Sequence, residues 1–181
     1  MSGLASEQHG RSMVEMLGVL AIIGVLSVAG IAGYSKAMAS FKRTKLIDQL
    51  SLLVTNIRAT YANQPDYAGV TNSVIINMGL IEEDMKVITS SGTVSPNKIK
   101  NVYGGDITII SYSGTRTSFF MIITNIPQNA CATLMVTDWG YNANNYLTRY
   151  LVNNYASNRL DLMLEQCKSG GSTNTIRIQH N

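Results

Sequence analysis

An apolar run near the start of the chain most constrains what this protein can be. Residues 13–34 read MVEMLGVLAIIGVLSVAGIAGY, and their only charged residue is Glu15. A helix of about 20 uncharged residues is long enough to cross a hydrocarbon layer of roughly 30 Å. A secretory signal would instead show basic residues first, a shorter apolar core and a small-residue cleavage site after that core. The run therefore predicts a membrane-spanning helix, and its single carboxylate requires a functional reason.

The residues around this carboxylate carry a specific resemblance. Gly10 precedes RSMVE, and Glu15 is followed by MLGVLAIIGV, which resembles the leader and N-terminal helix of a type IV prepilin or related pseudopilin. The resemblance implies a leader at residues 1–10, cleavage by a prepilin peptidase between Gly10 and Arg11, and N-methylation of Arg11. It also implies an assembly role for Glu15, since a carboxylate there neutralises the new α-amino group of a neighbouring copy in a low-dielectric helix bundle. The alternative is a simple membrane anchor with Glu15 in the headgroup region.

The apolar periodicity continues beyond the run. Leu46, Leu50, Leu53 and Ile57 recur every three or four residues with charged residues between them, which predicts an amphipathic helix. We expect one long helix from about residue 12 to about residue 62, ending before Pro65.

The resemblance implies the α+β pilin fold, in which a long N-terminal helix packs on a small antiparallel sheet and a disulfide bounds the C-terminal region. Residues 11–35 would then form the hydrophobic transmembrane and filament-core helix, and residues 36–64 its amphipathic half. Residues 65–181 would form the globular head domain.

Local patterns divide the head into elements. Residues 65–99 read as a linker with one short helix, capped by Thr71 or Asn72 and closed by Gly79. Strand character is expected from about Lys100, with a bend at YGG and a hairpin of residues 106–113 and 117–126. The remaining expectations are a helix over 128–136, an interrupted helical stretch over 146–166, and a terminal strand over 174–179.

The chain contains two cysteines, Cys131 and Cys167. An exported domain favours their pairing, and closing the loop would stabilise the fold by about 3 to 4 kcal/mol; two buried free thiols are the alternative. The order of YGG, strands, IPQNAC, a late cysteine and a terminal strand also resembles type IVb pilins. That resemblance implies that residues between the cysteines form a surface that meets neighbours.

Catalytic, metal and nucleic-acid functions find little support. The sequence has no HExxH, GxSxG or phosphate-loop motif, and its histidines, His9 and His180, lie near the two ends. We interpret Glu82, Glu83 and Asp84 as a solvated acidic turn rather than a metal site. The net charge of +3 is too small to argue for nucleic acid. We therefore predict no enzyme activity, no metal and no cofactor.

One aromatic cluster is a possible ligand surface. Trp139 and Tyr141 are close in sequence and are candidates for a surface ligand contact, although a lone tryptophan is more commonly a core or interface anchor.

The resemblance implies a structural subunit of a type IV pilus. Its precursor would be bitopic in the inner membrane with a periplasmic head, and its product an extracellular homo-oligomeric helical filament. Implied partners are the prepilin peptidase, the inner-membrane assembly platform with its ATPase, and the membrane. Two alternatives remain: a pseudopilin of a type II secretion system, and a membrane-anchored periplasmic binding or adhesive module that does not polymerise.

Overall fold

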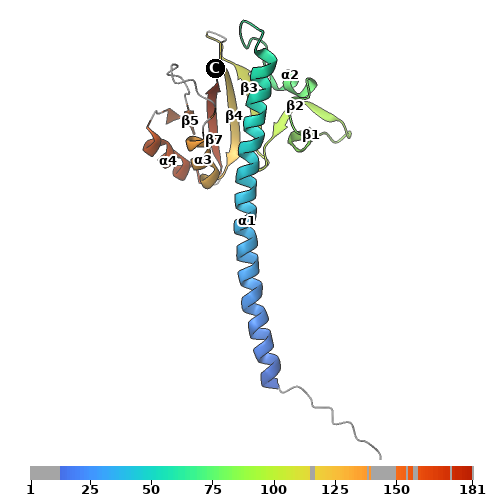
Figure 1. Cartoon of the computed structure of the whole chain (residues 1–181), viewed down its shortest axis with the longest axis vertical. Helices are drawn as coiled ribbons and strands as arrows, with labels where there is room; N and C mark the ends of the chain where they lie inside the picture. Colours follow the sequence, from blue (N-terminus) through green and yellow to red (C-terminus); the bar gives the residue numbers. More distant parts are fainter. Residues whose placement is uncertain are drawn as a thin grey trace, which may run out of the picture. The chain divides into compact units, whose positions relative to one another are not determined.

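The computed structural model of the chain describes residues 13–114, 117–137, 139, 150–153, 155–156, 159–171 and 173–180. It divides into two compact units, of which the first ends at Phe41 and the second begins at Lys42. Helix α1, Met13–Tyr61, starts in the first unit and ends in the second (Figure 1). The predicted long helix is therefore present with nearly its expected bounds.

The second unit is a seven-stranded sheet with helices, and its strand order is β1-β2-β3-β4-β7-β5-β6. All the strand pairs are antiparallel. The strands are β1 Lys86–Ile88, β2 Val94–Lys100, β3 Asp106–Ser111, β4 Phe119–Ile126, β5 Tyr150–Val152, β6 Tyr155–Ala156 and β7 Asn174–His180. The helices besides α1 are α2 Asn72–Asn77, the short 3₁₀ helix η1 Glu83–Met85, α3 Gln128–Val136 and α4 Leu160–Ser169. This is the predicted α+β class.

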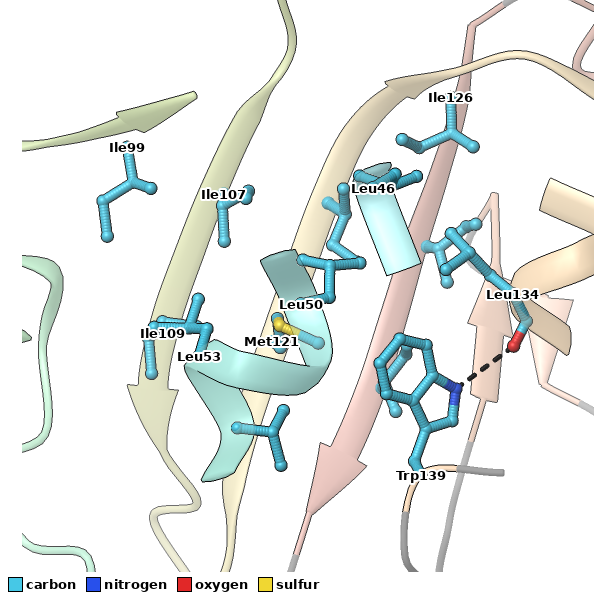
Figure 2. Packing of buried hydrophobic residues seen from close by; sticks show 14 of the residues in the cluster. Leu46, Leu50, Leu53, Ile99, Ile107, Ile109, Met121, Ile126, Leu134 and Trp139 are labelled. Atoms are coloured by element: carbon cyan, nitrogen blue, oxygen red, sulfur yellow. Dashed lines mark hydrogen bonds between the residues drawn. The ribbon is translucent and has the colours of Figure 1, made fainter. Parts of the chain in front are cut away.

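The second half of α1 covers one face of this sheet, which we call the inner face (Figure 1). Its leucines at the predicted spacing are fully or almost fully buried, and Figure 2 shows them lying over side chains of the central strands. Alternate residues of β3, β4 and β7 supply the other side of this core: Ile107, Ile109, Met121, Ile123, Ile176 and Ile178. Burying each large aliphatic side chain contributes about 1.5–3 kcal/mol, so the amphipathic half of α1 is held by its own sheet.

The side chain of Asn72, the first residue of helix α2, makes hydrogen bonds to strands β2 and β3 that these strands do not make with each other. The Thr71 hydroxyl accepts from the Val74 amide, which makes Thr71 the predicted N-cap. The Asn72 amide nitrogen donates to the carbonyls of Asn97 and Ile107, and its side-chain oxygen accepts from the Ile109 amide. Asn72 thereby joins β2 to β3 beyond the point where their own pairing stops at Ile99 and Ile107.

The predicted bend at YGG is present and is held by a buried asparagine. The Asn101 side-chain oxygen accepts from the amides of Tyr103 and Gly105, and its amide donates to the Thr124 carbonyl. A Cβ on Gly105 would lie 2.0 Å from that carbonyl oxygen, so only glycine fits this close approach.

Two of the predicted segments are wrong. Residues 65–99 are not a linker with one helix, because β1 and most of β2 lie there. The sequence VSPNKIK has Ser95 and Ile99 as its buried residues, which leaves little apolar alternation to detect. The helical stretch predicted over 146–166 is also wrong in its middle, where β5 and β6 lie; α4 begins only at Leu160.

Candidate functional site

The first half of α1 is an apolar surface without a partner inside its own unit. Residues 13–37 are all exposed, and an 18-residue window of the helix has a mean hydropathy of 2.4 with none of it buried. By length and composition, this helix can cross a membrane. A surface of this size and character requires lipid or other protein around it.

Two serine hydroxyls of this half are satisfied within the helix itself. Ser27 Oγ donates to the Ile23 carbonyl at 2.7 Å, and Ser35 Oγ donates to the Ile31 carbonyl at 3.0 Å. Hydroxyls bonded to their own backbone can enter an apolar environment at little cost. The half is therefore suited chemically to both a bilayer and a bundle of helices.

Glycines recur along the same half of α1. A Cβ added to Gly18, Gly24, Gly30 or Gly33 would meet no atom within 4 Å, so packing within the chain does not explain these glycines. Glycines on an apolar helix permit the close approach of a second helix.

Glu15 lies in the first turn of α1 and is exposed. A carboxylate at a helix N-terminus is favoured by the helix dipole. The predicted cleavage and methylation residues, Gly10 and Arg11, lie outside the described residues. The roles of all three therefore stay predictions.

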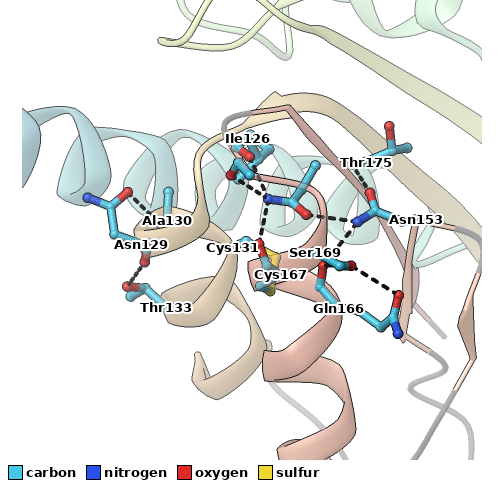
Figure 3. The surroundings of a disulfide bond; sticks show 12 residues. Ile126, Asn129, Ala130, Cys131, Thr133, Asn153, Gln166, Cys167, Ser169 and Thr175 are labelled. Atoms are coloured by element: carbon cyan, nitrogen blue, oxygen red, sulfur yellow. Dashed lines mark hydrogen bonds between the residues drawn. A yellow bond between two sulfur atoms is a disulfide. The ribbon is translucent and has the colours of Figure 1, made fainter.

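Cys131 and Cys167 form a disulfide that joins α3 to α4, with their Cα atoms 5.7 Å apart (Figure 3). Both residues are fully buried. The predicted pairing, part of the predicted fold, is confirmed.

A buried asparagine ties this disulfide to the sheet. The Asn174 amide nitrogen donates to the carbonyls of Ile126, Cys167 and Gly171, and its oxygen accepts from the Asn153 amide. Asn153 in turn donates to the Gln166 carbonyl and accepts from the Thr175 amide. No sequence pattern indicates this network, because it joins Asn174 to Asn153 and to the Ile126 carbonyl, which lie near it only in the folded chain.

Trp139 is not a surface residue. Its side chain is 7% exposed, and its indole nitrogen donates to the Leu134 carbonyl at 3.2 Å (Figure 2). The proposed ligand contact at Trp139 is therefore wrong, and the alternative of a core anchor is correct. Tyr141 lies outside the described residues.

His180 is buried beside the same tryptophan. Its ring stacks on Phe119 with centroids 5.1 Å apart and meets Trp139 edge-on at 6.1 Å. Burial, with a smaller contribution from the positive charge of Arg58, lowers the pKa of His180 from 6.5 to about 3. A neutral imidazole packed among aromatic rings is a core residue and not a general base.

The acidic turn contacts α1. Lys45 forms an ion pair with Asp84, and this hydrogen bond raises the pKa of Lys45. The Gln49 amide nitrogen donates to Glu82 at 3.2 Å and to Asp84 at 2.9 Å. Glu83 forms an ion pair with Lys86. Within the part of the chain that the structure describes, no group of three or more His, Cys, Asp or Glu residues is placed to hold a metal.

Comparison with known proteins gives a consistent result. The family model described as "PilS N terminal" matches residues 41–180. The major structural subunit of bundle-forming pilus from Escherichia coli O127:H6 (strain E2348/69 / EPEC) is 24% identical over 140 residues, covering 77% of this chain and 69% of that protein. The subunit of the same description from Escherichia coli O111:H- matches to the same extent.

The two Escherichia coli relatives are major structural subunits of a pilus, which supports a structural role. The family match begins at residue 41, and the prepilin-like motif around Glu15 precedes it. The family match and the prepilin-like motif lie in different parts of the chain, so each supports the same assignment independently. The chain belongs to the PilS N-terminal family and is a type IV pilin of the IVb-like class.

Proposed function

We propose that this pilin is the structural subunit of a type IV pilus filament assembled through the first half of α1. The single observation that carries the proposal is the contrast within one helix. Between residues 42 and 61 the large aliphatic side chains other than Leu52 are buried or half-buried against their own sheet, whereas residues 13–37 leave all of theirs exposed. That exposed surface has two successive environments in this proposal, the inner membrane before assembly and the filament core afterwards.

The precursor would be stored as a bitopic protein with its head in the periplasm. Residues 1–10 would be removed after Gly10 by a prepilin peptidase, and Arg11 would become the methylated N-terminal residue. Residues 11–35 would form the filament core and residues 36–64 the spine of the head at 65–181. The assembly platform and its ATPase would supply the work of extracting the helix from the bilayer.

Glu15 would set the register of assembly. Its carboxylate would neutralise the α-amino group of a neighbouring Arg11 within the helix bundle, because either charge alone is penalised in a low-dielectric core. Apolar packing of the remaining surface would provide most of the association free energy.

The relatives' pilus is named for forming bundles. We propose that filaments of this chain also associate side by side, and that their surface serves adhesion, aggregation, motility or conjugation-related contact.

The test is to express the full chain in its own cells with and without a prepilin peptidase. We expect a decrease in mass corresponding to residues 1–10 that requires the peptidase and is abolished by Gly10→Ala. We expect Glu15→Ala to be processed normally but to give no filaments in the sheared surface fraction. Gly18→Ala is the matched control for cleavage and should still lose residues 1–10, and Glu83→Ala, an exposed acid of the head, is the matched control for filament yield.

The alternatives give different results in the same experiment. A membrane-anchored module would keep its first ten residues and remain functional without forming filaments. A pseudopilin would be processed but would give no long filaments on the cell surface. Either outcome would contradict the proposed function.

A further inference from the structure

The sheet has a second face, turned away from α1, that no described helix covers. We call it the outer sheet face and define it by Ile110 of β3, Phe120 and Ile122 of β4, and Arg177 of β7, together with Tyr112, which directly follows β3. These strand positions alternate with the buried residues of the inner face. The face is mainly apolar, with Ile110 and Tyr112 among the exposed large side chains of the head.

Arg177 packs on an aromatic ring of this face. The guanidinium carbon of Arg177 is 3.7 Å from the centroid of the Phe120 ring, and Tyr112 meets the same ring edge-on at 5.4 Å. Phe120 is only 7% exposed, because these two side chains cover it. Cation–π contact fixes the orientation of the guanidinium.

Arg177 has no ion-pair partner among the residues that the structure describes. Its Nε is buried and makes no hydrogen bond within the same residues. A guanidinium presents five N–H donors in a fork that matches a carboxylate. A fixed and partly desolvated fork within an apolar patch is suited to an acidic group supplied by another molecule.

The chain itself carries a surface of complementary chemistry on α4. Leu160 is 48% exposed, and Asp161 and Glu165 are exposed one helical turn apart. Asp161 already pairs with Arg159, which lowers the pKa of Asp161. Glu165 has no partner among the described residues. This surface therefore offers an apolar side chain and an available carboxylate next to each other.

We propose that the outer sheet face of one copy docks on α4 of a second copy in an adjacent filament, with Arg177 bound to Glu165. This inference rests on the proposed function. The outer sheet face is the face that the second half of α1 leaves uncovered, so a second head can contact it. The two docking surfaces differ, so the contact is heterologous and can repeat along and between filaments instead of closing into a dimer.

The test uses charge exchange in filaments of the full chain, sheared from cells and kept at low ionic strength. In Arg177→Glu filaments both surfaces are acidic, and in Glu165→Arg filaments both are basic. We expect the laterally associated fraction of each, measured by electron microscopy and low-speed sedimentation, to fall roughly tenfold because like charges oppose. Mixing equal amounts of the two kinds of preformed filaments should restore association, since each surface then meets its opposite charge.

The controls separate this contact from general charge effects and from folding. Glu83→Arg changes an exposed acid of η1 that lies neither on the outer sheet face nor on α4 and should leave association unchanged. Glu165→Arg lies on an exposed helix surface, so it tests the contact even if Arg177→Glu disturbs the packing over Phe120. Added salt should disperse wild-type bundles through screening.

The outcomes distinguish this inference from the function on which it rests. If the wild-type chain gives no sheared filaments, the proposed function fails. If filaments form normally but both variants associate like the wild type, the docking proposal is overturned. It is also overturned if Arg177→Glu alone abolishes association while Glu165→Arg does not, because the acidic partner is then an external anion. Failure of the mixed filaments to associate would overturn it as well.

Discussion

His180 is a buried neutral imidazole, and we predict that it makes the fold acid-sensitive. Its pKa is about 3 in the folded chain against 6.5 for a solvated imidazole. The unfolded chain therefore takes up the proton first as the pH falls. The contribution to stability is complete above about pH 6.5 and is lost progressively as the pH falls towards 3. Between pH 6.5 and pH 5 the loss should be about 2 kcal/mol.

The measurement is the free energy of unfolding of the detergent-solubilised chain between pH 7 and pH 5, where few carboxylates titrate. His180→Phe keeps an aromatic ring against Phe119 and should flatten the profile in this range. An unchanged slope in this variant would show that the imidazole is not responsible.

Asn174 is the residue on which the C-terminal network depends. Replacing it with alanine removes donors to three carbonyls and leaves buried acceptors unsatisfied, each at a cost of about 1–3 kcal/mol. We predict a loss of about 3 kcal/mol for Asn174→Ala in chemical denaturation.

Asn129→Ala is the matched control, because Asn129 is exposed and its oxygen accepts only from the adjacent Ala130 amide. That variant should lose less than about 1 kcal/mol. Equal losses in both variants would contradict a special role for Asn174.

At the scale of elements, the disulfide is the covalent connection between α3 and α4. It closes a loop with a sequence separation of 36 residues. Replacing Cys131 and Cys167 together by alanine should lower the free energy of unfolding by about 3 to 4 kcal/mol in the chain-entropy model. Denaturation of the double variant measures this loss, and stability equal to that of the wild type would contradict it.

Several helices and strands lie where the sequence patterns predicted them. Helix α3 matches the predicted 128–136 segment, and β3, β4 and β7 occur where β-branched and aromatic residues gather. In contrast, β2 contains Pro96 and two lysines and is a strand because β1 and β3 pair with it and Asn72 bridges its end. Such support comes from residues distant in sequence, so local patterns could not predict it.

At the scale of the whole molecule, the glycines of the first half of α1 test assembly separately from folding. Gly24→Leu meets open space within the chain, so the precursor should accumulate at the wild-type level. If neighbouring helices approach closely at this position, the yield of sheared filaments should fall roughly tenfold.

Val25→Leu adds bulk one residue along the same helix and is the matched control. It should give close to the wild-type yield of filaments, since position 25 already carries a branched side chain. Equal filament yields from Gly24→Leu and the wild type would show that this glycine does not lie at a close helix contact.

The sequence by itself determined the long helix, its division into an unpartnered apolar half and an amphipathic half, the α+β class and the cysteine pair. These features depend on composition and on short-range periodicity, and both can be read directly from the sequence. Only the tertiary structure decided that Trp139 is buried, that β2, β5 and β6 are strands, and that Asn72 and Asn174 complete the backbone hydrogen bonding. It also decided which strand residues form the outer sheet face, because a residue's face depends on the register of strands that meet only when the chain is folded.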